Sequence, residues 1–154
     1  MKKYFLMGLW LLAICSHAQE IQWLNLEQAE KALKKTPEKP FFIDFYTDWC
    51  GWCKKMDQST FLEKEVVDYI HANYIPIKFN AESKEEVRFM GKSYRFVKAQ
   101  GGSRGVNSFA YFSLRGQLSY PAYAVIASDG KLDRLLLGFM NKDRLISGLK
   151  EARK

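Results

Sequence analysis

The chain is poor in residues that bind metals. Its 154 residues include two histidines and three cysteines, and no second Cys-x-x-Cys pair accompanies Cys50 and Cys53. His17 and Cys15 lie in an N-terminal segment with the features of a signal peptide, so a mature chain would keep only His71 as a histidine. A structural zinc site takes four protein ligands and a catalytic zinc site takes three. The ligand count therefore argues against a metal site, and we expect none.

The chain also lacks an apolar run long enough to cross a bilayer, which requires about 20 residues. Its N-terminus instead has two lysines, an apolar run from Tyr4 to Cys15 and the small-x-small sequence Ser16-His17-Ala18. These features are typical of a secretory signal peptide. We expect a signal peptide over residues 1–18 and a single domain over residues 19–154, a length that suits one hydrophobic core.

An alternative for the N-terminus is lipid attachment at Cys15. The sequence Leu12-Ala13-Ile14-Cys15 loosely resembles a bacterial lipoprotein box, but Ile14 is bulky where that motif has a small residue. Cleavage after Ala18 is therefore the preferred interpretation. Either way, the mature chain is expected to be periplasmic or otherwise exported.

Clusters of positive charge are absent, although the chain has 24 Lys and Arg residues against 17 Asp and Glu and a net charge of +7. The basic residues are scattered, without the Arg-rich arm or aromatic-basic platform of a nucleic-acid-binding protein. We expect no nucleic-acid partner. The excess of positive charge mildly favours acidic partners or an anionic membrane surface.

The sequence Cys50-Gly51-Trp52-Cys53 carries the reactive groups of the chain. A disulfide within it would close a very short loop, and short loops give the least stabilisation. The better interpretation is a reactive dithiol in an oxidising compartment. Such a motif requires its first cysteine to be exposed at the N-terminus of a helix that follows a strand, where N–H groups and the helix dipole stabilise the thiolate.

The flanking residues predict that arrangement. The run Phe41–Tyr46 is short and apolar, as in a strand that is buried on both faces. Thr47-Asp48-Trp49 predicts a turn, and a helix is expected from Cys50 onward. Lys54 and Lys55 place positive charge in the first turns of this helix, which also favours a thiolate.

The remainder of the chain alternates between helix and strand. Helices are predicted over Asn25–Lys35, Glu63–Ala72, Val106–Arg115 and Asn141–Arg153, and strands over Ile75–Phe79, Ala122–Ala127 and Leu132–Leu137. Ser128-Asp129-Gly130 predicts a hairpin turn between the last two strands. Parallel units followed by a hairpin and a final helix indicate an α/β fold with a mixed central sheet and helices on both faces.

Two stretches of the chain resemble the thioredoxin superfamily: FYTDWCGWCKKM and the following TFLEKEVVDYI. They are most similar to exported bacterial thioredoxin-like proteins and to the C-terminal domain of transmembrane thiol:disulfide interchange proteins. The resemblance covers nearly the whole mature chain. It implies a thioredoxin-like fold and a protein disulfide oxidoreductase, in which Cys50 attacks a substrate disulfide and Cys53 resolves the mixed disulfide.

This resemblance also implies partners and further catalytic residues. The partners would be disulfide-bearing proteins and a membrane-bound or exported redox protein, with no dissociable cofactor, and the chain is expected to be a monomer. Asp44 matches a buried acid that assists proton transfer, and Lys78 matches the lysine that faces this acid from the neighbouring strand. The alternatives are a water-facing Asp44 and an ordinary exposed Lys78. The apolar neighbours of Asp44 favour its burial, which would raise its pKa.

Substrate binding is assigned to residues that flank the cysteines and a proline. Pro121 matches the cis-proline whose loop lies against the disulfide and offers its backbone to the substrate, although it could merely open a strand. Tyr120 precedes this proline, and Gly51 lies between the cysteines. Trp49 and Trp52 are expected to form an apolar lip for a bound peptide, with core packing as the alternative.

The chain departs from thioredoxin in two respects. Trp52 occupies the position of a proline in ordinary thioredoxin, and the connection before Pro121 is long. The additional length lies in an inserted segment at about 86–105. Within this segment, a hairpin around residues 90–93 is predicted by the runs 87–89 and 94–97. Residues 101–105 predict a flexible hinge.

The direction of electron flow is a further expectation. Neither Gly51 nor Trp52 has a cationic side chain to stabilise the Cys50 thiolate, and a buried acid at Asp44 would disfavour a second negative charge nearby. Both effects favour a reductase. The alternative function, from a different class, is a peptide- or partner-binding module in which the disulfide is only structural.

Overall fold

The computed structural model describes residues 20–98 and 104–152. The expected signal peptide over residues 1–18, the lipid-attachment alternative at Cys15 and residues 101–103 of the expected hinge lie outside these ranges. Among the residues described, no helix combines the length and the apolar character needed to cross a membrane.

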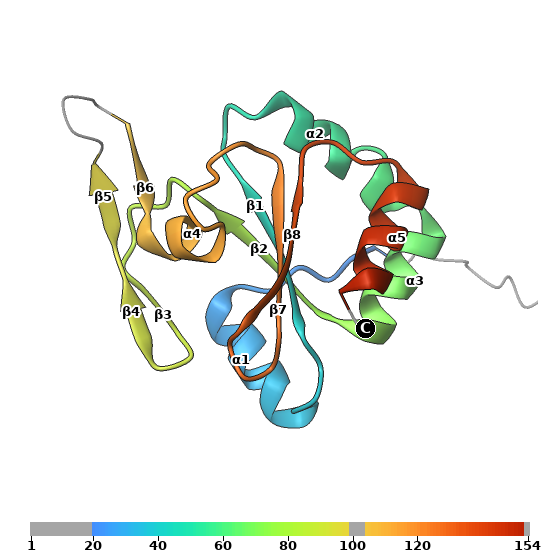
Figure 1. The fold of residues 1–154 in the computed structure, drawn as a ribbon, viewed down its shortest axis with the longest axis horizontal. Coiled ribbons are helices and arrows are strands. Elements are labelled where there is room, and N and C mark those ends of the chain that lie inside the picture. The colour runs from blue at the N-terminus through green and yellow to red at the C-terminus, as the bar shows by residue number, and fades with distance from the viewer. Residues whose placement is uncertain (1–19, 99–103, 153–154) are drawn as a thin grey trace, which may run out of the picture.

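A four-stranded mixed sheet forms the centre of the molecule (Figure 1). Its strands are β1 (Phe41–Tyr46), β2 (Ile75–Asn80), β7 (Ala122–Ile126) and β8 (Leu132–Leu137), in the order β2-β1-β7-β8. Strand β1 pairs in parallel with β2 and antiparallel with β7, and β7 pairs antiparallel with β8. The mixed sheet and its C-terminal hairpin are as predicted.

Helices cover both faces of this sheet (Figure 1). They are α1 (Leu26–Lys35), α2 (Gly51–Asp57), α3 (Lys64–Asn73), α4 (Ser108–Ser113) and α5 (Lys142–Glu151), with a short 3₁₀ helix, η1, at Thr60–Leu62. Residues of α1 and α4 share one hydrophobic core with one face of the sheet, and residues of α2, α3 and α5 share a second core with the other face.

The sequence of β1 explains why the sheet is covered on both sides. Successive side chains of a strand point to opposite faces. Phe41, Ile43 and Phe45 belong to the core beneath α1 and α4, whereas Phe42 belongs to the core beneath α3 and α5. Asp44 has the parity of Phe42, so a carboxyl group enters the second core.

The predicted helix over Val106–Arg115 begins later than expected. Val106 belongs to a strand, β6 (Gly105–Asn107), and α4 begins only at Ser108. The reason is Asn107, which is fully buried and caps α4 by accepting a hydrogen bond from the N–H of Phe109 at 3.0 Å. An N-cap residue has extended backbone, so the helix cannot begin before it.

The inserted segment consists of two hairpins rather than one. Strand β3 (Val87–Phe89) pairs with β4 (Lys92–Tyr94) around Met90-Gly91, and both turn residues have positive φ, at 50° and 76°. This two-residue turn is tighter than the predicted turn over residues 90–93. Phe96 and Val97, which the sequence predicts to lie in the same hairpin, instead lie in β5 (Phe96–Lys98), which pairs with β6.

Gly105 permits the close approach of β5 and β6. A β-carbon at this position would lie 2.4 Å from the ring of Phe96 and 2.5 Å from the carbonyl oxygen of Val97. Gly105→Ala is therefore expected to lower the free energy of unfolding by about 1–3 kcal/mol, the usual cost of overpacking. Denaturant titration measures the change. Gly51→Ala is the control, because no atom lies within 4 Å of its added β-carbon; equal stability of the two variants would contradict the prediction.

Candidate active site

A disulfide joins Cys50 and Cys53 at the start of α2. Strand β1 ends at Tyr46, and Cys50 is the N-cap residue of the helix that begins at Gly51. The Sγ atom of Cys50 accepts a hydrogen bond from the backbone N–H of Cys53 at 3.0 Å. The predicted order of strand, turn and helix is therefore present, and an N–H group is directed at the sulfur atom that would carry the thiolate.

The expected exposure of Cys50 is wrong for this disulfide form. Cys50 is 3% exposed and Cys53 is 4% exposed, so both are buried and accessibility does not distinguish them. The disulfide holds the Cys50 sulfur against the first turn of α2, where it also accepts the hydrogen bond from the Cys53 N–H. What distinguishes the two sulfur atoms is the hydrogen bond from the Cys53 N–H to Cys50.

The two tryptophans that flank the disulfide are exposed, at 61% for Trp49 and 62% for Trp52. They are not core residues. The indole of Trp49 donates a hydrogen bond to Glu82 at 3.1 Å and meets the ring of Tyr120 edge-on, while Trp52 lies against Phe139. An apolar lip thus exists on two sides of the motif, and its role in peptide binding stays a prediction.

The peptide bond between Tyr120 and Pro121 is cis, as the resemblance implied. Burial, with a smaller contribution from Glu82, raises the pKa of Tyr120 to about 12, so its hydroxyl is neutral at physiological pH. Gly51 is exposed and has open space where a side chain would project. A substrate chain would find little steric hindrance there.

Asp44 is buried, with 2% of its surface exposed, so the water-facing alternative is wrong. It lies on β1 between Lys78 of β2 and Tyr123 of β7. One carboxylate oxygen, Oδ2, lies 3.1 Å from the Lys78 ammonium, and the other, Oδ1, has no hydrogen-bond partner among the described residues. Burial raises the pKa of Asp44 to about 6, against the opposing attraction of Lys78. A carboxyl group with this pKa can exchange protons near neutral pH.

Lys78 is not an ordinary exposed strand residue. Its ammonium lies 5.3 Å from the ring centre of Trp23 and 5.4 Å from that of Tyr46, within the range of cation–π attraction. Burial alone would lower the pKa of Lys78, but the carboxylates of Asp44 and Asp57 together raise it above its usual value. Lys78 is therefore a fixed positive charge.

Asp57 is a residue that the sequence reasoning missed. It ends α2 and forms an ion pair with Lys78. Asp57 follows Cys53 by four residues, so both lie on the same face of the helix, and this spacing was the signal available in the sequence. The side chain of Asp57 is 40% exposed and that of Asp44 is 2% exposed, so Lys78 connects a buried carboxyl group to one that water reaches.

Removal of the Lys78 charge tests this arrangement. In Lys78→Met, Asp44 would lose its attracting cation, so its pKa should rise above 6 and the protein should lose about 2–4 kcal/mol of stability at pH 8. Carbon-13 NMR titration of the Asp44 carboxyl group and denaturant unfolding are the measurements. Lys31→Met is the matched control, because its pair with Glu27 is exposed and worth under about 1 kcal/mol. An unchanged Asp44 titration would refute the coupling.

No group of three histidine, cysteine or acidic residues within 20–98 and 104–152 is arranged to hold a metal ion. The chemistry that the site offers is exchange between thiols and disulfides, which requires only a thiolate, a disulfide sulfur and access to it.

A family model for a thioredoxin-like domain matches residues 26–153. The chain belongs to this family. It is 29% identical over 125 residues to the thiol:disulfide interchange protein DsbD of Neisseria meningitidis. The matched region covers 80% of this chain but only 17% of that relative. The chain thus spans about a sixth of the length of this relative.

Solved structures agree with the family. The oxidised C-terminal domain of Neisseria meningitidis DsbD is 27% identical, with a TM-score of 0.55 and coverage of 82% of this chain and 91% of that domain. A putative disulphide-isomerase from Bacteroides thetaiotaomicron has a TM-score of 0.62 and 23% identity, over 90% of this chain and 98% of its own. This similarity shows that the two chains share a fold. The predicted thioredoxin-like fold and the resemblance to the interchange proteins are confirmed.

Proposed function

We propose that the chain is an exported thiol:disulfide oxidoreductase that reduces protein disulfides through Cys50 and Cys53. The observation that carries this proposal is the Cys50–Cys53 disulfide at the start of α2, with the Cys53 N–H directed at the Cys50 sulfur. The broader class of activity, that of a disulfide oxidoreductase on a thioredoxin fold, is also supported by the names and structures of its relatives.

The reaction begins from the reduced form. The thiolate of Cys50 attacks one sulfur of a substrate disulfide and releases the other as a thiolate. Cys53, once deprotonated, then attacks the Sγ of Cys50 in the mixed disulfide and releases the second substrate thiol. Two electrons pass to the substrate, and the Cys50–Cys53 disulfide forms. Asp44, whose pKa is about 6, is ionised at neutral pH and available to accept the proton of Cys53.

The surroundings of Cys50 support the proposed direction of electron flow. Strong oxidants of this class have an unusually stable thiolate. Here Gly51 and Trp52 contribute no positive charge, and the carboxylate of Asp44 disfavours a second negative charge. We expect a reduction potential nearer to about −270 mV than to about −120 mV. Equilibration with glutathione buffers measures this potential, and a value at the oxidising end would reverse the proposed direction.

The proposed partners are disulfide-bearing proteins and a membrane-bound or exported redox protein that renews the dithiol. The name of the Neisseria relative, a thiol:disulfide interchange protein, supports this choice. Export, with cleavage after Ala18, and a monomeric state are parts of the same proposal.

Reduction of insulin tests the activity directly. With dithiothreitol as the electron source, the wild-type protein should accelerate insulin precipitation, whereas a Cys50→Ser/Cys53→Ser variant should not exceed dithiothreitol alone. A wild-type protein that also fails to exceed dithiothreitol alone would favour the binding-module alternative, in which the disulfide is only structural.

A further inference from the structure

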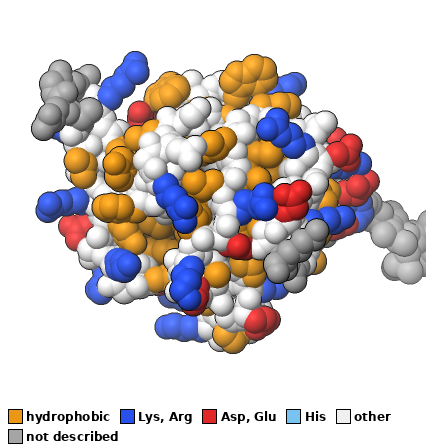
Figure 2. All heavy atoms as spheres, viewed as in Figure 1, with side chains coloured by type: hydrophobic (Ala, Val, Ile, Leu, Met, Phe, Trp, Pro, Cys, Tyr) orange, Lys and Arg blue, Asp and Glu red, His pale blue; other side chains and the backbone are white. Residues whose placement is uncertain are grey.

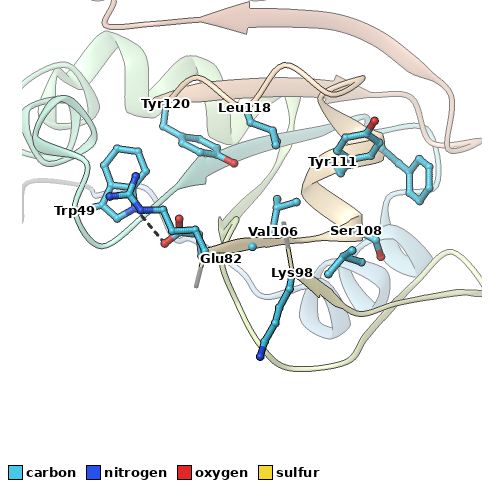
Figure 3. A pocket seen from close by; sticks show the side chains of 12 residues that line it. Trp49, Glu82, Lys98, Val106, Ser108, Tyr111, Leu118 and Tyr120 are labelled. Carbon is cyan, nitrogen blue, oxygen red and sulfur yellow. Dashed lines mark hydrogen bonds between the residues drawn. The ribbon is translucent and has the colours of Figure 1, made fainter. Parts of the chain in front are cut away.

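A groove of about 660 Å³ lies beside the active site, between the β5–β6 hairpin, α4 and the loop before Pro121 (Figure 3). Its lining is mainly apolar: Val97, Val106, Tyr111, Phe112, Leu118 and Tyr120. Pockets of this size are typical of ligand-binding sites. The inserted β5–β6 hairpin supplies one wall, so the groove depends on a feature that departs from thioredoxin.

The groove is continuous with the active site. Trp49 and Tyr120 both line it, and they directly precede Cys50 and Pro121 in the chain. Their rings meet edge-on with 6.2 Å between centroids. The hydrogen bond from the Trp49 indole to Glu82, drawn in Figure 3, fixes this wall. A chain that contacts the disulfide can therefore extend directly into the groove.

Several apolar side chains of the groove are exposed. Phe112 is 66% exposed, Val97 51% and Leu118 40%. Figure 2 shows hydrophobic side chains gathered over the region of α4 and the inserted hairpins. Clustered exposed apolar surface of this kind marks a site of interaction.

Positive charge borders the same groove. Lys98 and Arg104 belong to its lining and are exposed. Neither forms an ion pair with a residue in 20–98 or 104–152, where the charged pairs involve other side chains. The nearby acid, Glu82, is engaged by Trp49. An acidic group on a ligand would complement the two cations.

We propose that this groove binds an extended segment of the substrate protein, in which an aromatic or large aliphatic residue neighbours an acidic residue close to the disulfide to be reduced. The proposal rests on the proposed function, because it names the class of substrate for the same site. The apolar side chain enters between Phe112 and Val97, and the acidic residue faces Lys98 and Arg104. The insertion thus selects among protein disulfides.

A binding measurement that needs no redox chemistry tests the groove by itself. The probe is a fluorescein-labelled, cysteine-free peptide with a central Phe-Asp pair, titrated with the oxidised protein and followed by fluorescence anisotropy. Replacement of Phe by Ala in the peptide should weaken binding about tenfold, which corresponds to about 1.4 kcal/mol. Replacement of Asp by Lys should weaken binding several-fold, and added salt should reduce this difference.

Variants of the protein test whether the peptide binds in the groove. Phe112→Gln should weaken binding of the Phe-Asp peptide about tenfold, whereas Leu62→Gln, at a similarly exposed apolar residue outside the groove lining, should not. Lys98→Glu should weaken it more than Lys92→Glu, since Lys92 is exposed on the other inserted hairpin. The proposal would be overturned by equal affinity for the Phe and Ala peptides or by equal effects of Phe112→Gln and Leu62→Gln. It would also be overturned if the wild-type protein were a dimer that the Phe112→Gln substitution dissociates.

Kinetics separate this proposal from the proposed function. The test compares reduction of a cysteine-linked disulfide of the Phe-Asp peptide with reduction of oxidised glutathione. The ratio of the two rates should fall several-fold in Phe112→Gln and stay constant in Leu62→Gln. A constant ratio in both variants overturns the groove proposal. Failure to reduce either disulfide, with peptide binding intact, overturns the proposed reductase and leaves the groove established.

Discussion

A Cys53→Ala variant is expected to accumulate covalent complexes with substrate proteins, joined through Cys50, whereas Cys50→Ala should accumulate none. The first step of exchange requires only the Cys50 thiolate, and removal of Cys53 blocks the step that would release the substrate. Turnover should fall to background in both variants. Non-reducing electrophoresis with oxidised insulin, followed by mass spectrometry of the linked cysteines, measures the trapping.

The structure explains why the two cysteine variants should differ, although the solvent exposure of the cysteines does not. Both cysteines are buried to the same degree, at 3% and 4% exposed. The hydrogen bond to the Cys50 sulfur comes from the backbone N–H of residue 53, so it is retained when the side chain of Cys53 is replaced by a methyl group. Stabilisation of the Cys50 thiolate should therefore survive in Cys53→Ala.

The Cys50→Ala/Cys53→Ala double variant is the control for complexes that form without a thiol. Iodoacetamide labelling across a pH range provides a second readout, since the thiolate of Cys50 should react at a lower pH than that of Cys53. Equal trapping by the two single variants would contradict the assignment of Cys50 as the attacking residue.

The sequence alone was sufficient to predict those structural features that neighbouring residues determine. The apolar run Phe41–Tyr46 is itself the signature of a strand covered on both faces, and Asn25 with Gln28 forms the capping box that begins α1. Burial of Asp44 could be inferred because a strand places alternate residues on one face, and its neighbours on that face are apolar.

Features that depend on the meeting of distant segments were missed or misplaced. Asn107 caps α4 but also donates hydrogen bonds to carbonyl groups of Ser83 and Glu85, which hold β6 in extended form. No helical periodicity in Val106–Arg115 reveals those partners. The ion pair of Asp57 with Lys78 likewise requires the end of α2 to lie near β2, an arrangement that no local pattern encodes.

Asp44→Asn is expected to stabilise the protein at pH 8 and to slow its turnover. The pKa of Asp44 is raised from 3.8 to about 6, so the folded state binds the proton more tightly than the unfolded state does. Above pH 6 the carboxyl group is ionised in both states, and its burial costs up to about 3 kcal/mol at about 1.4 kcal/mol per pKa unit. Asparagine removes this cost but also removes a partner of Lys78, so a net gain of about 1–3 kcal/mol is expected.

The pH dependence identifies the group responsible. As the pH falls from 6 toward 4, the folded protein takes up the proton first, and the stability advantage of Asp44→Asn over wild type should shrink toward zero. Denaturant unfolding at pH 8, 6 and 4 measures this difference. Asp133→Asn, at an exposed acid on β8, should change stability by less than about 0.5 kcal/mol at every pH.

Turnover supplies the second half of the test. If Asp44 accepts the proton of Cys53, reduction of insulin by Asp44→Asn should be at least about tenfold slower at pH 7, within the range of general-base effects, and the loss should narrow as rising pH ionises Cys53 without assistance. A variant that is more stable but equally fast would show that Asp44 is buried for reasons unrelated to catalysis. A variant with neither change would mean that the carboxyl group is solvated in solution. Slower turnover that recovers at high pH, together with a stability gain confined to pH above 4, is the combination expected of a buried proton acceptor.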